Sequence, residues 1–97
     1  MLFLIEVSFR QGVRPEEGRP AATMLRDRLQ KPATGIKILN SVADIGGSKI
    51  VVLADLSDEA MNDLRYTLEF RTLVAVERIT YTPVVDAKAT LDAYLGI

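Results

Sequence analysis

One carboxylate stands in an unusual place for a charged side chain. Glu6 falls within the apolar run from Met1 to Phe9. A carboxylate among apolar neighbours is either paired with a cation or binds a proton more readily than usual, and the second state suits proton transfer to or from carbon. If the chain is an enzyme, we therefore expect Glu6 to be the catalytic proton carrier. The structural alternatives are an ion pair with Arg78 on an adjacent strand, or simple exposure on a surface face.

Polar residues of other expected strands could orient a ligand beside that carboxylate. Asn40 and Tyr81 are the candidate substrate-binding residues, and Ser41 and Thr80 are further polar strand residues. Each of them is also compatible with a structural or solvated role, so the hypothesis depends on their acting together.

A glycine-rich segment resembles the tail of a phosphate-binding loop. It reads Gly46-Gly47-Ser48-Lys49. Such loops need a helix after them so that amides at the helix start point at phosphate, and here the following residues predict a strand. A hairpin turn is the better interpretation, since glycine supplies the positive φ that such turns need.

Composition removes several kinds of chemistry. The chain of 97 residues has no Cys and no His, which excludes thiolate nucleophiles, disulfides, zinc-thiolate sites and the commonest general base. Lys and Arg number 12 against 13 Asp and Glu, so there is no electrostatic reason to expect a nucleic-acid partner. We expect no metal and no cofactor.

The apolar start of the chain resembles neither a secretory signal nor a membrane span. Glu6 and Ser8 interrupt it, no basic leader precedes it, and Arg10 follows it. We therefore expect a cytoplasmic protein with no membrane partner.

Hydrophobic periodicity predicts the elements that position these residues. Strands are expected over residues 1–9, 36–44, 49–56 and 73–82, the last closed by Pro83. In the second strand we expect Ile36, Ile38 and Val42 on one face beside Asn40. Helices are expected from Pro15 or Pro20 to Gln30, from the N-cap Ser57 to Glu69 or Phe70 along the stripe Ala60, Met61, Leu64 and Leu68, and over residues 86–95.

This order, βαββαβ plus a terminal helix, predicts an α+β fold. We expect one ferredoxin-like domain over residues 1–97, with a four-stranded antiparallel sheet and both main helices on the same face. The charged residues of the first expected helix complement its dipole. Glu16 and Glu17 lie at its start, and Arg26, Arg28 and Lys31 lie toward its end.

Two helices can cover only one face of such a sheet, yet apolar residues occur at both parities. The third strand contains the continuous run 50–53, and the first strand places Leu2 and Leu4 opposite its phenylalanine face. We expect a second copy of the chain to cover that face, with each buried Leu or Val contributing about 1.5 to 3 kcal/mol. The alternative is that these residues lie at strand ends or under the terminal helix.

The arrangement resembles the dimeric α+β barrel superfamily, and within it the muconolactone isomerase-like proteins. The resemblance rests on short matches that occur in the same order over about 80 residues. They are Met1-Leu2-Phe3, Arg28-Leu29-Gln30, Asp55, and Leu68 and Phe70 leading into Val76-Glu77. It implies a cofactor-free barrel of two packed sheets, often in higher oligomers, with a small-molecule pocket between sheet and helices or at the subunit boundary.

The resemblance also implies an activity, because muconolactone isomerase shifts a double bond by proton transfer. The chain departs from those isomerases at Leu39, Asn40 and Ser41, where they carry aromatic and basic residues, and at Glu6, which replaces a basic residue. The leading hypothesis is a cofactor-independent isomerase or cyclase-like enzyme acting on a small lactone or aromatic-derived substrate. The second is a non-catalytic ligand-binding or homo-oligomeric assembly module of the same fold.

Overall fold

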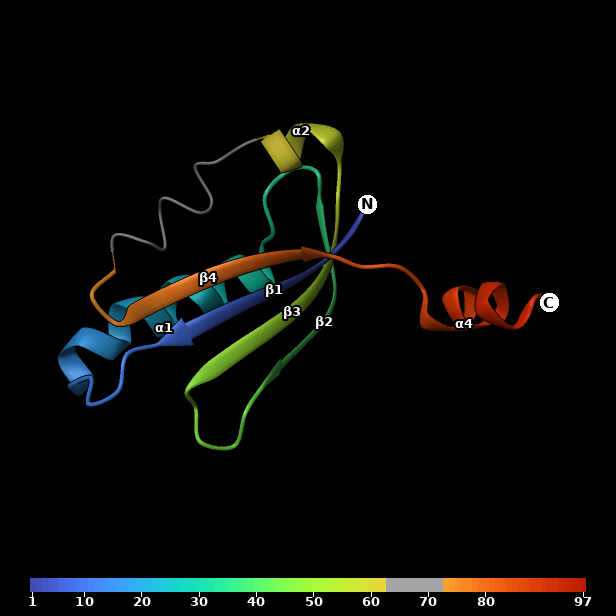
Figure 1. Cartoon of the computed structure of the whole chain (residues 1–97). Helices are drawn as coiled ribbons and strands as arrows, with labels where there is room; N and C mark the ends of the chain where they lie inside the picture. Colours follow the sequence, from blue (N-terminus) through green and yellow to red (C-terminus); the bar gives the residue numbers. More distant parts are fainter. Residues whose placement is uncertain (63–72) are drawn as a thin grey trace.

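Four antiparallel strands form one sheet, with a long helix running along one of its faces (Figure 1). The structure is a computed structural model and describes residues 1–62 and 73–97. Its elements are β1 (Leu2–Phe9), α1 (Pro15–Gln30), β2 (Ile36–Ala43), β3 (Lys49–Leu56), α2 (Asp58–Asn62), β4 (Val76–Pro83) and α4 (Ala87–Leu95). The strand order β2-β3-β1-β4 is that of a ferredoxin-like α+β fold, which confirms the predicted fold class.

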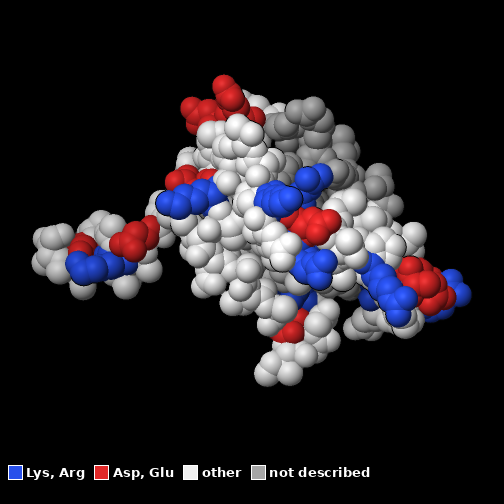
Figure 2. Space-filling view, turned by 180° about the vertical axis from the view of Figure 1, so that it is seen from behind, with Lys and Arg blue, Asp and Glu red and all other residues white. Residues whose placement is uncertain are grey.

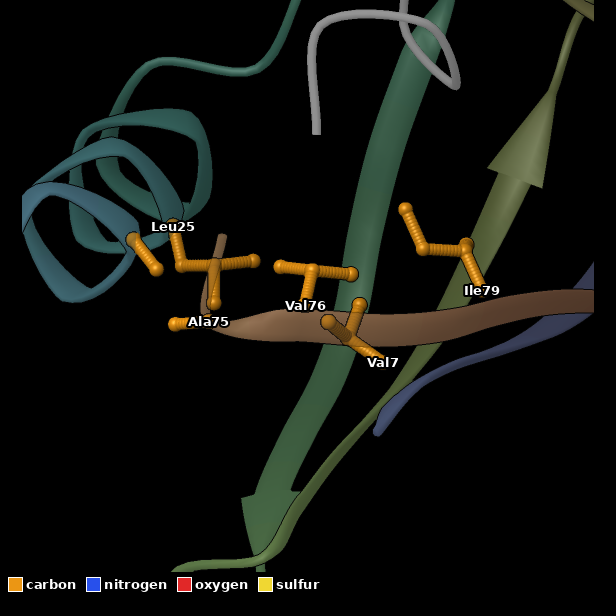
Figure 3. Packing of buried hydrophobic residues seen from close by; sticks show 6 residues of the cluster. Val7, Leu25, Ala75, Val76 and Ile79 are labelled. Carbon is orange, nitrogen blue, oxygen red and sulfur yellow. The ribbon is translucent and has the colours of Figure 1, made fainter. Parts of the chain in front are cut away.

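Two apolar clusters join the helices to the covered face of the sheet. In the first, Val7 of β1 packs with Leu25 of α1 and with residues from β4 and the turn before it (Figure 3). The second cluster has three buried β3 residues with side chains of α1 and α2 against them: Val52, Ala54 and Leu56, with Leu29, Ala60 and Met61. Both predicted main helices therefore begin on the same face of the sheet.

The opposite face carries no helix among the described residues, and we call it the open face. Strand alternation assigns to it the residues that lie between those of the two clusters. These are Leu2, Leu4, Glu6 and Ser8 of β1, Lys49, Val51, Leu53 and Asp55 of β3, and Arg78, Thr80 and Thr82 of β4. Leu2, Leu4, Val51 and Leu53 are only half-buried there.

A bulge in β2 overturns the predicted face of two residues. Ile38 pairs with Ala54 and Asn40 with the next β3 residue, Leu53, so Leu39 is an extra residue in the ladder. Because one extra residue inverts the alternation, Asn40 and Val42 lie on the open face while Ile36 and Ile38 lie on the covered face. The prediction that Ile36, Ile38 and Val42 share one face beside Asn40 is therefore wrong.

Helix α1 begins at Pro15, the earlier of the two predicted starts. Proline is favoured in the first turn, because N–H groups there have no carbonyl within the helix to donate to, so the missing proline N–H costs no hydrogen bond. Arg14 adds an ion pair there, its guanidinium lying 2.7 Å from Glu17 Oε1. Pro20 lies inside the helix, where it removes one backbone hydrogen bond without ending it.

Strand β4 is shorter at its start than predicted. Residues 73–75 form a turn in which the Val76 amide donates to the Leu73 carbonyl at 3.1 Å. The strand ends at Pro83, as expected. β4 is an edge strand, so the missing proline donor leaves no ladder bond broken.

The two later helices start at side-chain caps. Ser57 Oγ accepts from the Ala60 amide at 3.2 Å, which confirms the predicted N-cap of α2. The continuation of that helix to Glu69 or Phe70, with Leu64 and Leu68, lies outside the described residues. Asp86 caps α4 through the Ala89 amide at 2.9 Å.

Helix α4 stands apart from the sheet (Figures 1 and 2). Its apolar side chains Leu91, Tyr94 and Leu95 are 59%, 87% and 72% exposed. It therefore covers neither face of the sheet within this chain. No helix in the described ranges 1–62 and 73–97 is both long and apolar enough to span a membrane.

Gly35 gives a test of how the turn into β2 is built. Its φ is +84°, and a Cβ added there would collide with Ser57, the cap of α2. We expect Gly35→Ala to lower the free energy of unfolding by about 2 kcal/mol or more, because backbone strain and loss of the cap add together. Urea unfolding measures this loss.

Gly12→Ala is the matched control. Gly12 also has positive φ (+70°), but nothing lies within 4 Å of an added Cβ, so only the backbone term of about 1 kcal/mol remains. Equal losses in the two variants would show that the collision with Ser57 does not matter.

Candidate functional site

Glu6 lies near the middle of the open face, between two polar neighbours. In the ladder it stands opposite Val51 of β3 and Thr80 of β4. Thr80 Oγ1 donates to Glu6 Oε2 at 3.4 Å, and Lys49 Nζ lies 3.7 Å from Glu6 Oε1. The first distance is long for a hydrogen bond and the second is long for an ion pair, so the carboxylate is held loosely.

The ion pair identifies the cation that sequence reasoning missed. Arg78 was the partner considered among the structural alternatives, but it stands opposite Ser8, and among the described residues the cation within ion-pair distance of Glu6 is Lys49. Lys49 also stands opposite Ser8, on the other side of β1, and so reaches Glu6 diagonally. The side chains of Glu6 and Lys49 are 33% and 46% exposed, so solvent weakens their attraction.

Asn40 shares the open face with Glu6 but lies two strands away. Its cross-strand partner is Leu53, which in turn stands opposite Leu4. Its side-chain oxygen already accepts from the Ser41 amide at 2.8 Å. A ligand that touched both Asn40 and Glu6 would have to lie across the apolar Leu4 and Leu53 pair.

Tyr81 lies on the covered face, away from Glu6. It stands opposite Ile5 and packs against the cluster that contains Val7 and Ile79. One chain therefore does not bring Tyr81 and Glu6 to the same side of the sheet. The alternation of Ile79 and Tyr81 in the sequence was the available signal, because residues two apart share a face.

The groups on the open face suit proton transfer in one respect. A half-exposed carboxylate beside a hydroxyl can accept a proton and keep a hydrogen bond in either state. In residues 1–62 and 73–97, no group of three or more His, Cys, Asp or Glu side chains is placed to hold a metal ion. The roles of Glu6, Asn40 and Tyr81 stay predictions.

The turn between β2 and β3 is fixed by a second carboxylate. Asp44 accepts from Ser48 Oγ at 2.7 Å through one oxygen and from the Lys49 amide at 2.8 Å through the other. The hydrogen bond from Ser48, followed by that from the Lys49 amide, holds the pKa of Asp44 below its usual value. Gly47, at φ +71°, completes the turn, so the glycine-rich segment is a hairpin turn as predicted.

Fold and geometry together define a class of protein: a small α+β domain with a ferredoxin-like antiparallel sheet and a paired carboxylate on the open face. Within that class, the chain belongs to the family described as domain of unknown function (DUF3303), whose model matches residues 1–96. No curated protein matches the chain significantly. Neither comparison supports the likeness to muconolactone isomerases.

The hydrogen bonds of Asp44 predict a pH dependence of stability. A lowered folded pKa means that the contribution is fully present above the unfolded value, about 3.9, and is lost as pH falls through the folded pKa. We expect the chain to be more stable than its Asp44→Asn variant at about pH 6, and this advantage to vanish at strongly acid pH. Urea unfolding of both proteins across that range measures the difference.

Asn keeps the shape of the side chain without its charge, so the pH dependence of the stability difference between the two proteins reports the ionisation of Asp44. A stability difference that did not change with pH would contradict the prediction.

Proposed function

We propose that the chain is a homo-oligomeric domain in which two copies pack open face against open face, in the manner of a dimeric α+β barrel. The observation that supports this most is the apolar band across the open face. Leu4 and Leu53 are cross-strand partners at its centre, and Val51 and Val42 are partners in the next row. Val42 is 57% exposed.

The position of the charged groups is consistent with such a contact. Lys49 and Glu6 flank the band on one side, and Asp55 and Lys37 are cross-strand partners on the other. Arg78, also on the open face, lies exposed on the edge strand β4, so two copies related by a two-fold axis can bring their bands together while Arg78 stays in water.

Helix α4 supports the same conclusion independently. Its side chains Leu91, Tyr94 and Leu95 are exposed in the single chain, and a second copy supplies apolar surface for them. A helix with an uncovered apolar side is stabilised mainly by what it packs against, so α4 is expected to gain order on assembly.

Replacing Leu53 by Lys tests the assembly. We expect the wild-type chain to form dimers or larger oligomers at micromolar concentration, and Leu53→Lys to raise the dissociation constant by at least about tenfold, because it places a charge at the centre of the apolar band. Sedimentation equilibrium measures this constant.

Val74→Lys is the matched control, since Val74 is 64% exposed in the turn before β4. It should leave the oligomeric state unchanged. A wild-type chain that is monomeric at micromolar concentration would refute the proposal.

A second candidate function is a cofactor-independent isomerase or cyclase-like enzyme that acts on a small lactone or aromatic-derived substrate. The observation that favours it is the half-exposed Glu6 carboxylate with Thr80 Oγ1 beside it and the apolar Val51 opposite it. In a face-to-face dimer this carboxylate would lie at the junction of two sheets, partly shielded from water, where proton transfer is favoured. Asn40, on the same face, would then contact the substrate from the neighbouring region of the junction.

Glu6→Gln separates the two functions. An enzyme that uses Glu6 as proton carrier should exchange deuterium from solvent into the acidic carbon of muconolactone, and the variant should do so at least about 100-fold more slowly while remaining folded and dimeric. Proton NMR follows the exchange.

Thr82→Val serves as control, because Thr82 lies on the same face opposite Leu4 and not beside Glu6. Exchange by Glu6→Gln at the wild-type rate would remove Glu6 from the proton-transfer step. Absence of exchange with the wild-type chain would leave the assembly function alone.

A further inference from the structure

On the covered side of the molecule, a cleft of about 650 Å³ opens between α1 and the β2–β3 turn. The end of β1 and the loop after it form one wall, and the turn residues Gly46, Gly47 and Ser48 form another. Its volume is that of a typical small-molecule site. The cleft lies on the side of the sheet opposite to Glu6, so it is separate from the candidate site on the open face.

The lining of the cleft combines an apolar floor with two cations. The apolar lining residues are Phe9, Val13, Leu25, Leu29 and Ile50, and the cationic ones are Arg10 and Arg26. Among residues 1–62 and 73–97, no Asp or Glu lines the cleft. The charged residues of the described lining are therefore both cations, which favours an anionic group in the cleft.

Both arginines are available to a ligand. Neither Arg10 nor Arg26 forms a side-chain hydrogen bond or ion pair with any residue in the described ranges. Asp44, at the base of the adjacent turn, makes its hydrogen bonds with Ser48 and the Lys49 amide and not with either arginine. Arg26 thus has a further use besides complementing the dipole of α1.

Glycine keeps part of the wall open. Gly12 and Gly47 line the cleft, and a Cβ added at either would meet no atom within 4 Å. A ligand can therefore approach the backbone closely at both positions.

We propose that this cleft binds a small organic carboxylate with an apolar body, such as an aromatic or short aliphatic acid. The apolar floor takes the hydrocarbon part, and Arg10 and Arg26 hold the carboxylate, because the planar guanidinium matches a carboxylate with two parallel hydrogen bonds. The apolar residues and the arginines together determine which ligand binds. An uncharged apolar molecule would not bind to the arginines, and an inorganic anion would make no contact with the apolar residues.

Titration with benzoate and hexanoate tests the proposal, with benzamide and hexanamide as uncharged controls. At about 10 mM ligand, even a site of millimolar dissociation constant is well occupied. We expect at least one acid to shift the amide NMR signals of Gly12, Gly47 and Ser48 in a saturable way, and its amide to bind at least about tenfold more weakly.

Variants assign the charge contacts. Arg10→Gln and Arg26→Gln should each weaken binding of that acid by about tenfold or more, and both together should abolish it. Arg19→Gln is the matched control, since Arg19 lies on α1 but does not line the cleft. Ala22→Phe, which adds bulk at the cleft on an exposed helix position, should block binding while the protein stays folded.

Three results from the acids and the variants would each overturn the proposal. They are no saturable shift with either acid, equal binding of an acid and its amide, and equal loss in the Arg19 control. Inorganic phosphate binding more tightly than both acids would also overturn it, because the floor would then contribute nothing. The Leu53→Lys variant should bind as the wild type does, so failure of the assembly proposal leaves this test intact.

Discussion

The structure depends on a mismatch between a sheet with two faces and helices that cover one. Val7, Val52 and their neighbours are sealed by α1 and α2, while Leu4, Val51 and Leu53 on the other parity are only half-buried. Apolar surface of that extent is stabilised by removal from water. The open face and α4 therefore share one property: both expose apolar side chains that the helices of the described residues do not cover.

The charged groups follow that division between faces. On the open face, Glu6 is accompanied by Lys49 and Thr80 at distances that allow rearrangement. On the covered side, Arg10 and Arg26 line a cleft and form no ion pair with an acidic residue of the described part of the chain. Loosely held charges respond to a ligand or a partner at small cost, whereas tightly bonded ones, such as Asp44 in its turn, chiefly fix the backbone.

Much of this fold could be predicted from local pattern, because strand alternation, glycine turns and side-chain caps act within a few residues. The hairpin at Gly46 and Gly47, the cap at Ser57 and the placement of Glu6 on the even-numbered face all follow from such pattern. The ion-pair partner of Glu6 could not be predicted in this way. Lys49 on β3 and Arg78 on β4 both stand opposite Ser8, on the two sides of β1, so strand pattern does not distinguish between them. Arg10 and Arg26 lie 16 positions apart in the sequence, and only the return of α1 over β1 brings both to one cleft.

The extra residue in β2 has a consequence for how this strand tolerates change. Ile36 and Ile38 serve the helices, whereas Asn40 and Val42, after Leu39, serve the open face. Deleting Leu39 would restore a regular ladder and keep both halves of the strand on their present faces, because Ile38 and Asn40 already stand opposite consecutive residues of β3. We therefore expect the strand to tolerate loss of Leu39 better than loss of a residue within either half, which would turn that half over.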